Sequence, residues 1–162
     1  PAPCVWNHYL SCAVKNPEEF IKTPWIRPED APLYEQAGIS SLMISSNNMA
    51  AWYKEVVLGA YARGSYGGNL LRLLGHDSPK DRASLKAGLP GNPMAIRAYI
   101  DNRALDGFLA PFADGRLDCG GCCDKCVYCA ETAAKVVEMD QGWRKGFLER
   151  VAALKDQTLS LE

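Results

Sequence analysis

The sequence lacks the features that place a chain in a membrane or on nucleic acid. It has no apolar run of about 18 residues and no basic segment followed by an apolar one near its beginning. Neither a membrane span nor a signal peptide is therefore predicted. The net charge of -1 provides no clustered excess of Lys and Arg for phosphate binding, so nucleic-acid binding is not supported. We expect a cytoplasmic protein that does not associate with membranes.

The sequence also lacks the patterns of the common hydrolases. Histidine occurs only twice, at His8 and His76, and no His-Glu-x-x-His pair or recognisable Ser/His/Asp spacing is present. A peptidase is consequently the least favoured of the function classes considered below. Composition otherwise fits one globular domain with a proper core, because 48% of the residues are apolar and 23% are charged.

Cysteine is the residue type that the sequence has in excess. Five of the seven cysteines lie within eleven residues, and two more lie near the other end of the chain: Cys119, Cys122, Cys123, Cys126 and Cys129, then Cys4 and Cys12. An odd number of cysteines, crowded at two-residue spacings and without secretory signals, is more typical of metal binding than of disulfides. We predict a metal or cluster site in a reducing compartment, and all seven cysteines are candidate ligands.

Zinc is one candidate for this site. Two Cys-x-x-Cys pairs, Cys119/Cys122 and Cys126/Cys129, form the usual set of four thiolates for structural zinc. Only three residues separate these pairs, whereas zinc ribbons use a longer arm between them. The short spacing counts against zinc.

An iron–sulfur cluster is the favoured candidate. Cys123, Cys126 and Cys129 match the three-cysteine core of bacterial ferredoxin sequences, which hold three corners of a [4Fe–4S] cluster. Cys4 or Cys12 could supply the fourth ligand, in which case the two ends of the chain meet at the cluster. Disulfide-bonded or unligated cysteines remain a third alternative.

The order of predicted elements indicates an α/β fold. A helix should open at 27–30 and end at Gly38, a buried strand should follow at 39–45, and a helix with one wide apolar face should cover 49–64. Asn69 should cap a short apolar turn at 70–74. Further elements are predicted as a strand at 21–26 and helices beginning at Asn92-Pro93, at 127–139 and at 143–159. We divide the chain into 1–75, a helical connector at 76–118, and a cysteine-rich helical region at 119–162.

Four residues outside the cysteine group are weak candidates for catalysis. His8 lies between Cys4 and Cys12, and Arg27 precedes the adjacent carboxylates of Glu29 and Asp30. Acidic residues in the first turn of a helix also stabilise the helix dipole, and we favour this structural role for the two carboxylates. The turn at 66–69 could cradle a phosphate, but it lacks the lysine of a P-loop.

Four short segments in the first half of the chain together form a recognisable motif. They are Trp25-Ile-Arg-Pro-Glu-Asp30, Tyr34-Glu35, Gly38-Ile39 and Gly64-Ser-Tyr-Gly-Gly-Asn-Leu70. These residues resemble the collagenase-like peptidases, the U-32 peptidase family. The resemblance covers about residues 1–75. It implies the C-terminal βα units of a TIM-like barrel, with an iron–sulfur cluster held by cysteines near the barrel mouth.

The same resemblance implies a function. Several family members resemble oxygen-independent hydroxylation enzymes that act on ring or nucleobase substrates, some of them as paired subunits. It implies that Cys4 and Cys12 belong to the cysteine loop of the family, and that Arg27, Glu29 and Asp30 form a motif at the barrel edge. The first half of a barrel is missing, because a complete one needs about 200 residues. The chain begins at Pro1 and is expected to be a processed chain or the C-terminal piece of something longer.

Two classes of function stay open beside the peptidase. The first is a component of a redox or hydroxylating enzyme that carries a [4Fe–4S] cluster and acts on a small-molecule or ring substrate. The second is a non-catalytic assembly module, stabilised by zinc or a cluster. In either class we expect a partner subunit or a missing N-terminal half to close the barrel, since open strand edges are unfavourable.

Overall fold

The computed structural model describes residues 10–22, 25–44, 51–87, 95–119 and 126–159. This part of the chain is mixed α/β, mostly helical, with one sheet of two short strands. Residues 10–15 are helical. The elements that follow are α2 (Glu19–Lys22), η1 (Pro28–Asp30), α3 (Ala31–Gln36), α4 (Ala51–Arg63), α5 (Leu70–Leu73), α6 (Arg82–Ala87), β1 (Ala98–Ile100), η2 (Arg103–Leu105), α7 (Ala110–Ala113), α8 (Tyr128–Val136), β2 (Val137–Met139) and α9 (Gln141–Leu159).

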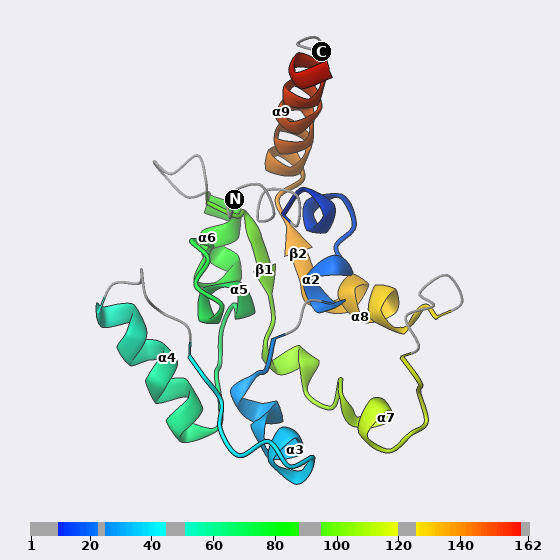
Figure 1. The fold of residues 1–162 in the computed structure, drawn as a ribbon. Coiled ribbons are helices and arrows are strands. Elements are labelled where there is room, and N and C mark those ends of the chain that lie inside the picture. The colour runs from blue at the N-terminus through cyan, green and yellow to red at the C-terminus, as the bar shows by residue number, and fades with distance from the viewer. Residues whose placement is uncertain (1–9, 23–24, 45–50, 88–94, 120–125, 160–162) are drawn as a thin grey trace.

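The two strands lie at the centre of the molecule (Figure 1). β1 and β2 are antiparallel, with Tyr99 opposite Glu138 in the register. α5 and α6 pack against β1, and α2 packs against α8 on the other side of the sheet. α9 extends away from this body. None of the helices in the described ranges is long and apolar enough to cross a membrane.

Several elements confirm the predictions from sequence. Gly38 has a φ of 92° directly after α3, and the Ile39 amide donates to the Tyr34 carbonyl across that turn at 3.0 Å. Only glycine adopts such a φ without strain, so Gly38 ends the helix as expected. α4 and α9 match their predicted ranges closely, and Asn69 caps α5 by accepting a hydrogen bond from the Leu71 amide at 3.2 Å.

Four predicted elements were wrong. The helix expected after Asn92-Pro93 is replaced by β1, whose residues 98–100 are all buried. A strand covered on both faces has a continuous apolar sequence, which periodicity alone does not distinguish from a buried helix. The helix predicted at 127–139 ends at Val136, and its last three residues form β2. The strand predicted at 21–26 begins within α2, and residues 39–44 of the strand predicted at 39–45 pair with no strand in the part of the chain that the structure describes.

One apolar core joins the whole described chain. It contains Leu10, Val14, Phe20 and Ile21 from the N-terminal helices, Val57 and Ala60 from α4, Leu70, Leu71 and Leu73 from α5, Ile96, Ala98, Ile100, Leu105 and Phe108 from the centre, and Ala133 and Val136 from α8. The core therefore draws on all three predicted segments, whose boundaries stay a prediction. The described residues form no barrel; they contain one pair of strands.

Candidate functional site

The described cysteines fall on two helical segments and one loop. Cys12 lies in the helix at 10–15, Cys119 is exposed after α7, and Cys126 and Cys129 lie at the start of α8. None of these four forms a disulfide. The predicted ligands Cys4, Cys122 and Cys123, and the weak catalytic candidate His8, lie outside the described residues.

Two of the described cysteines lie at the start of α8, Cys129 within the helix and Cys126 two residues before it. Val127 occupies the N-cap position, and no side chain there accepts a hydrogen bond from the first turn. The first amides of a helix have no partner within the helix, and the helix dipole favours negative charge at this end. Cys126 and Cys129 flank the N-cap, the first just before the helix and the second within its first turn.

Three aromatic rings hold this helix start in place. Tyr128 stacks on Phe108 with ring centroids 5.3 Å apart, and Phe112 packs edge-on against both rings at 5.6–5.9 Å. The Tyr128 hydroxyl donates to the Phe108 carbonyl at 3.0 Å. The segment before the cysteine group and the helix after it are thus fixed to each other. Sequence spacing alone does not connect Phe108 and Phe112 with Tyr128, because contacts between distant segments arise from packing.

The two cysteine-bearing ends of the chain share one side of the core. α2 packs against α8, and Leu10 and Val14 of the first helix lie in the same core cluster as Ala133 and Val136. Arg144 at the start of α9 also connects the two ends of the chain. Its guanidinium donates to the carbonyls of residues 14 and 15 in the N-terminal segment at 2.9 and 2.7 Å. The packing thus brings the N-terminal helices onto α8, and whether Cys12 shares a ligand site with Cys126 and Cys129 stays a prediction.

The donor set fits a soft metal or an iron–sulfur cluster, because thiolates prefer these over hard cations. Within the described ranges, no group of three or more His, Cys, Asp or Glu side chains is placed to hold a metal ion. Three of the seven predicted ligands lie outside those ranges. The cysteine site is therefore a prediction that rests on spacing and on the environment of Cys126 and Cys129.

A second cluster of polar residues surrounds Arg27. This side chain is 1% exposed, and its guanidinium makes a bidentate ion pair with Asp30 at 2.7 and 2.8 Å. It also donates to the Asn102 carbonyl at 2.5 Å and to the exposed Asp106 carboxylate at 3.0 Å. Burial alone would lower the pKa of Arg27, but its bonds to Asp30 and Asp106 raise it above the ordinary value, so the group stays charged.

Glu29 is part of the same network but faces another segment. Its Oε1 accepts hydrogen bonds from the Tyr66 amide at 2.6 Å and from the Asn102 side-chain amide at 2.9 Å. Oε2 of Glu29 and Oδ1 of Asn102 are buried and have no hydrogen-bond partner among the described residues. Glu29 therefore binds Tyr66 and Asn102, whereas Asp30 binds Arg27, and neither carboxylate makes a side-chain cap on η1 or α3.

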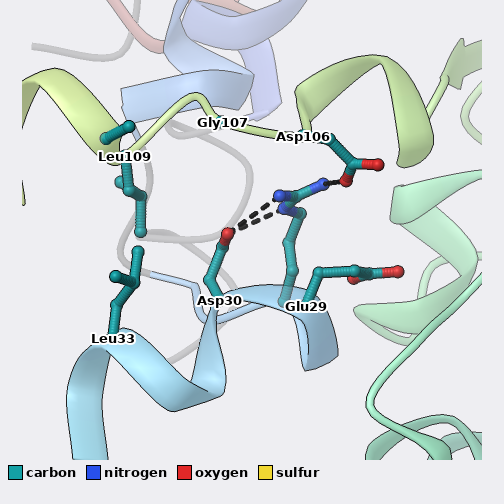
Figure 2. A pocket seen from close by; sticks show the side chains of 8 residues that line it. Glu29, Asp30, Leu33, Asp106, Gly107 and Leu109 are labelled. Carbon is teal, nitrogen blue, oxygen red and sulfur yellow. Dashed lines mark hydrogen bonds and ion pairs between the residues drawn. The ribbon is translucent and has the colours of Figure 1, made fainter. Parts of the chain in front are cut away.

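A pocket of about 280 Å³ lies beside this network. Asp30 and Asp106 both pair with the Arg27 guanidinium, and Figure 2 shows Leu33 and Leu109 next to each other on the side of the pocket away from Asp106. The pocket thus has one apolar wall and one acidic wall. Because Arg27 is fully engaged by protein groups, the accessible polar group here is the carboxylate of Asp106.

The turn at 66–69 has a structural role, because it connects α5 to other segments of the core. Asn69 is fully buried, and its side-chain amide donates to the carbonyls of Pro79 and Ala98 at 2.7 and 2.9 Å. Its Oδ1 accepts from the Ile100 amide at 3.0 Å in addition to capping α5. With these bonds made inside the protein, and with only four residues in α5, the turn does not resemble a phosphate-binding loop.

His76 is the histidine that the structure describes. Burial lowers its pKa from 6.5 to about 4, so the imidazole is neutral in the folded protein at neutral pH. Between pH 6.5 and 4 the unfolded chain binds a proton at His76 that the folded chain does not bind, so stability falls as the pH falls through this window.

Replacing His76 with glutamine should remove this contribution. We expect the difference in unfolding free energy between pH 7 and pH 4 to be smaller in His76→Gln than in the original chain, as measured by urea denaturation at several pH values. Carboxylates that titrate in the same window affect both proteins equally. Identical pH profiles would show that the imidazole is not protected from protonation by the fold.

Comparison with known proteins gives one relative. A protein of Methanocaldococcus jannaschii, named an uncharacterized protease, is 30% identical over 134 residues, which are 83% of this chain and 35% of that protein. A stretch of this length within 162 residues necessarily includes residues 29–134, and hence the cysteine group. The chain spans about a third of the relative's length. No protein-family model and no solved structure matches the chain.

Proposed function

We propose that this chain is the cluster-binding part of an iron–sulfur protein related to the U-32 peptidases. The observation that carries the proposal is the start of α8, where Cys126 and Cys129 flank a helix N-terminus that has no side-chain cap, at the end of a crowded cysteine sequence. Thiolates at that position are stabilised by the helix dipole, and the amides of the first turn can donate to sulfur. When bound, a [4Fe–4S] cluster would supply one-electron chemistry or a coordination position for substrate.

The family part of the proposal has two supports. The first is the motif Ile26-Arg-Pro-Glu-Asp30 in its order with Gly38 and the helix at α4. The second is the similarity to an archaeal protein whose name includes the word protease. Within this family we favour a component of a redox or oxygen-independent hydroxylation enzyme, because no peptidase constellation is visible in the sequence.

The pocket beside Arg27 is the proposed place for a small-molecule or ring substrate. Its apolar wall, formed by Leu33 and Leu109, suits a ring face, and the exposed carboxylate of Asp106 can accept hydrogen bonds from N–H or O–H groups. Arg27, Glu29 and Asp30 then position the pocket from beneath, since their polar atoms are mostly engaged within the protein.

Metal analysis of the anaerobically purified chain tests the cluster. We expect iron and acid-labile sulfide together with the broad visible absorption of a cluster, and we expect Cys126→Ala and Cys129→Ala to lose most of the iron. Val127→Ala is the matched control, because Val127 lies between the two thiols, is 62% exposed and carries no ligand. This variant should keep its iron.

Other results of the same analysis would overturn the proposal in defined ways. One zinc per chain without sulfide would replace the cluster by a structural zinc site and favour the assembly module. Full iron content in both cysteine variants would exclude the start of α8 as a ligand site. Peptide hydrolysis that survives alanine replacement of all cysteines would favour the peptidase suggested by the relative's name.

A further inference from the structure

The pocket beside Arg27 is lined by an excess of acidic side chains. Among the described residues that line it, Glu29, Asp30 and Asp106 contribute three carboxylates and Arg27 contributes one cationic group. The lining therefore carries two more negative than positive charges. Arg27 and Asp30 form a buried bidentate pair at 2.7 and 2.8 Å, which compensates one charge of each sign. The negative charge in excess comes from Glu29 and Asp106.

Asp106 is the acidic group that a ligand can reach. Its side chain is 62% exposed, and its Oδ1 accepts a hydrogen bond from Arg27 at 3.0 Å, whereas Oδ2 accepts none from the part of the chain that the structure describes. Glu29 also lines the pocket, and its buried Oε2 has no hydrogen-bond partner among the described residues. Neither carboxylate is thus fully paired by these residues.

Arg27 does not offer a binding group to an anionic ligand in the same place. Its side chain is buried, and its N–H groups already donate to Asp30, to Asp106 and to the Asn102 carbonyl. A carboxylate or phosphate in the pocket would meet the excess negative charge without an accessible donor to offset it. Because an uncompensated charge is costly to desolvate, the lining selects against anions.

The other side of the pocket is apolar. Leu33 and Leu109 lie next to each other on the side away from Asp106 (Figure 2). A cavity of about 280 Å³ has room for one ring or a short aliphatic group. A bare metal ion makes no use of such a wall, and within the described ranges no three His, Cys, Asp or Glu side chains are placed to hold one. The occupant that matches both sides is an organic cation.

We propose that the pocket binds an organic cation, in which an ammonium, amidinium or guanidinium group pairs with Asp106 while an apolar or ring portion packs on Leu33 and Leu109. This inference rests on the proposed function, which places the substrate in this pocket, and it narrows the substrate to compounds with a positively charged N–H donor. Hydrogen bonds between charged groups are about twice as strong as neutral ones, so the charge of the ligand should decide its affinity.

Three ring compounds of similar size and different charge test the proposal: benzamidine is cationic, benzamide is neutral and benzoate is anionic. Each is added to the anaerobically purified chain while NMR follows the methyl resonances of Leu33 and Leu109. We expect benzamidine to shift these resonances and to bind at least about ten-fold more tightly than benzamide, and we expect no shift with benzoate. Added salt should weaken the binding of benzamidine, because the Asp106 carboxylate is exposed to solvent.

Asp106→Asn isolates the charge of this side chain. Asparagine keeps an oxygen that can accept from Arg27, so the fold should be retained, whereas the affinity for benzamidine should fall at least about ten-fold. Asp114→Asn is the matched control. Asp114 follows α7, pairs with Arg116 and is not part of the pocket lining, so its replacement should leave the affinity unchanged.

Three results would overturn the proposal. Equal affinities for benzamidine and benzamide, or an unchanged affinity for benzamidine after Asp106→Asn, would keep the pocket but remove the preference for a cation. The absence of a shift with all three compounds would overturn both the cation and the pocket as a substrate site. Iron content is measured separately, so none of these results affects the cluster proposal, and loss of the cluster proposal leaves the binding test valid.

Discussion

Replacing Arg27 with methionine is expected to lower the free energy of unfolding by about 3–5 kcal/mol, the usual cost of removing one partner from a buried ion pair. The change leaves the Asp30 carboxylate, whose side chain is 6% exposed, without its bidentate partner. It also removes the donor to the Asn102 carbonyl, which connects the segment before α3 to η2 across 75 residues of sequence. Urea denaturation, monitored by circular dichroism, measures the change.

Two further variants distinguish the loss of the buried ion pair from the loss of a positive charge alone. Arg116→Met removes an ion pair with Asp114 on an exposed part of the surface, and we expect no measurable loss of stability. The double variant Arg27→Met/Asp30→Leu should recover part of the loss, because no uncompensated charge is then left inside. Equal effects of Arg27→Met and Arg116→Met would contradict the role of Arg27 as the centre of a buried network.

Replacing Asn69 with alanine should be nearly as costly. The substitution leaves two carbonyls, of Pro79 and Ala98, and the amide of Ile100 without their partners in a fully buried place, and it removes the cap of α5. We expect a loss of about 3 kcal/mol or more, since each buried group left unsatisfied costs about 1–3 kcal/mol. Equilibrium unfolding of the purified variant checks this.

Two nearby changes serve as controls for Asn69. Asn16→Ala alters an exposed asparagine and should have little effect. Ser78→Ala removes only a long contact of 3.3 Å to the Asn69 amide and the weak bond from Ser78 to His76, so a loss below about 1 kcal/mol is expected. A loss after Ser78→Ala as large as that after Asn69→Ala would contradict the central position of Asn69.

Local chemistry in the sequence determined several parts of the structure. Gly38 ended a helix because the position requires a positive φ, and Asn69 capped α5 because a short amide side chain can accept from the first turn. These rules act within a few residues of chain and need no tertiary context. The crowding of cysteines likewise predicted metal chemistry, because thiolate spacing is a local property.

Other predictions failed where burial and strand pairing decided the outcome. Residues 98–100 became a strand because β2 pairs with them and both of their faces are covered, which an apolar run does not reveal. Residues 39–44 kept the alternation of a strand but found no neighbour among the described residues. The strand predicted there therefore failed among the described residues, because pairing depends on a neighbouring strand that local sequence does not provide.

The same distinction between local sequence and tertiary packing applies to the candidate functional residues. Sequence alone marked Arg27, Glu29 and Asp30 as a group, and their spacing could mean either catalysis or a helix start. Only the tertiary structure showed that Asn102 and Asp106, more than 70 residues away, complete the network and turn Arg27 into a buried centre. The stacking of Tyr128 on Phe108 beside the cysteines was equally invisible, because contacts between distant segments arise from packing. Thus the sequence by itself determined the local caps and turns and predicted thiolate chemistry at the cysteines, whereas the fold decided which distant segments contact one another, because such contacts arise from packing.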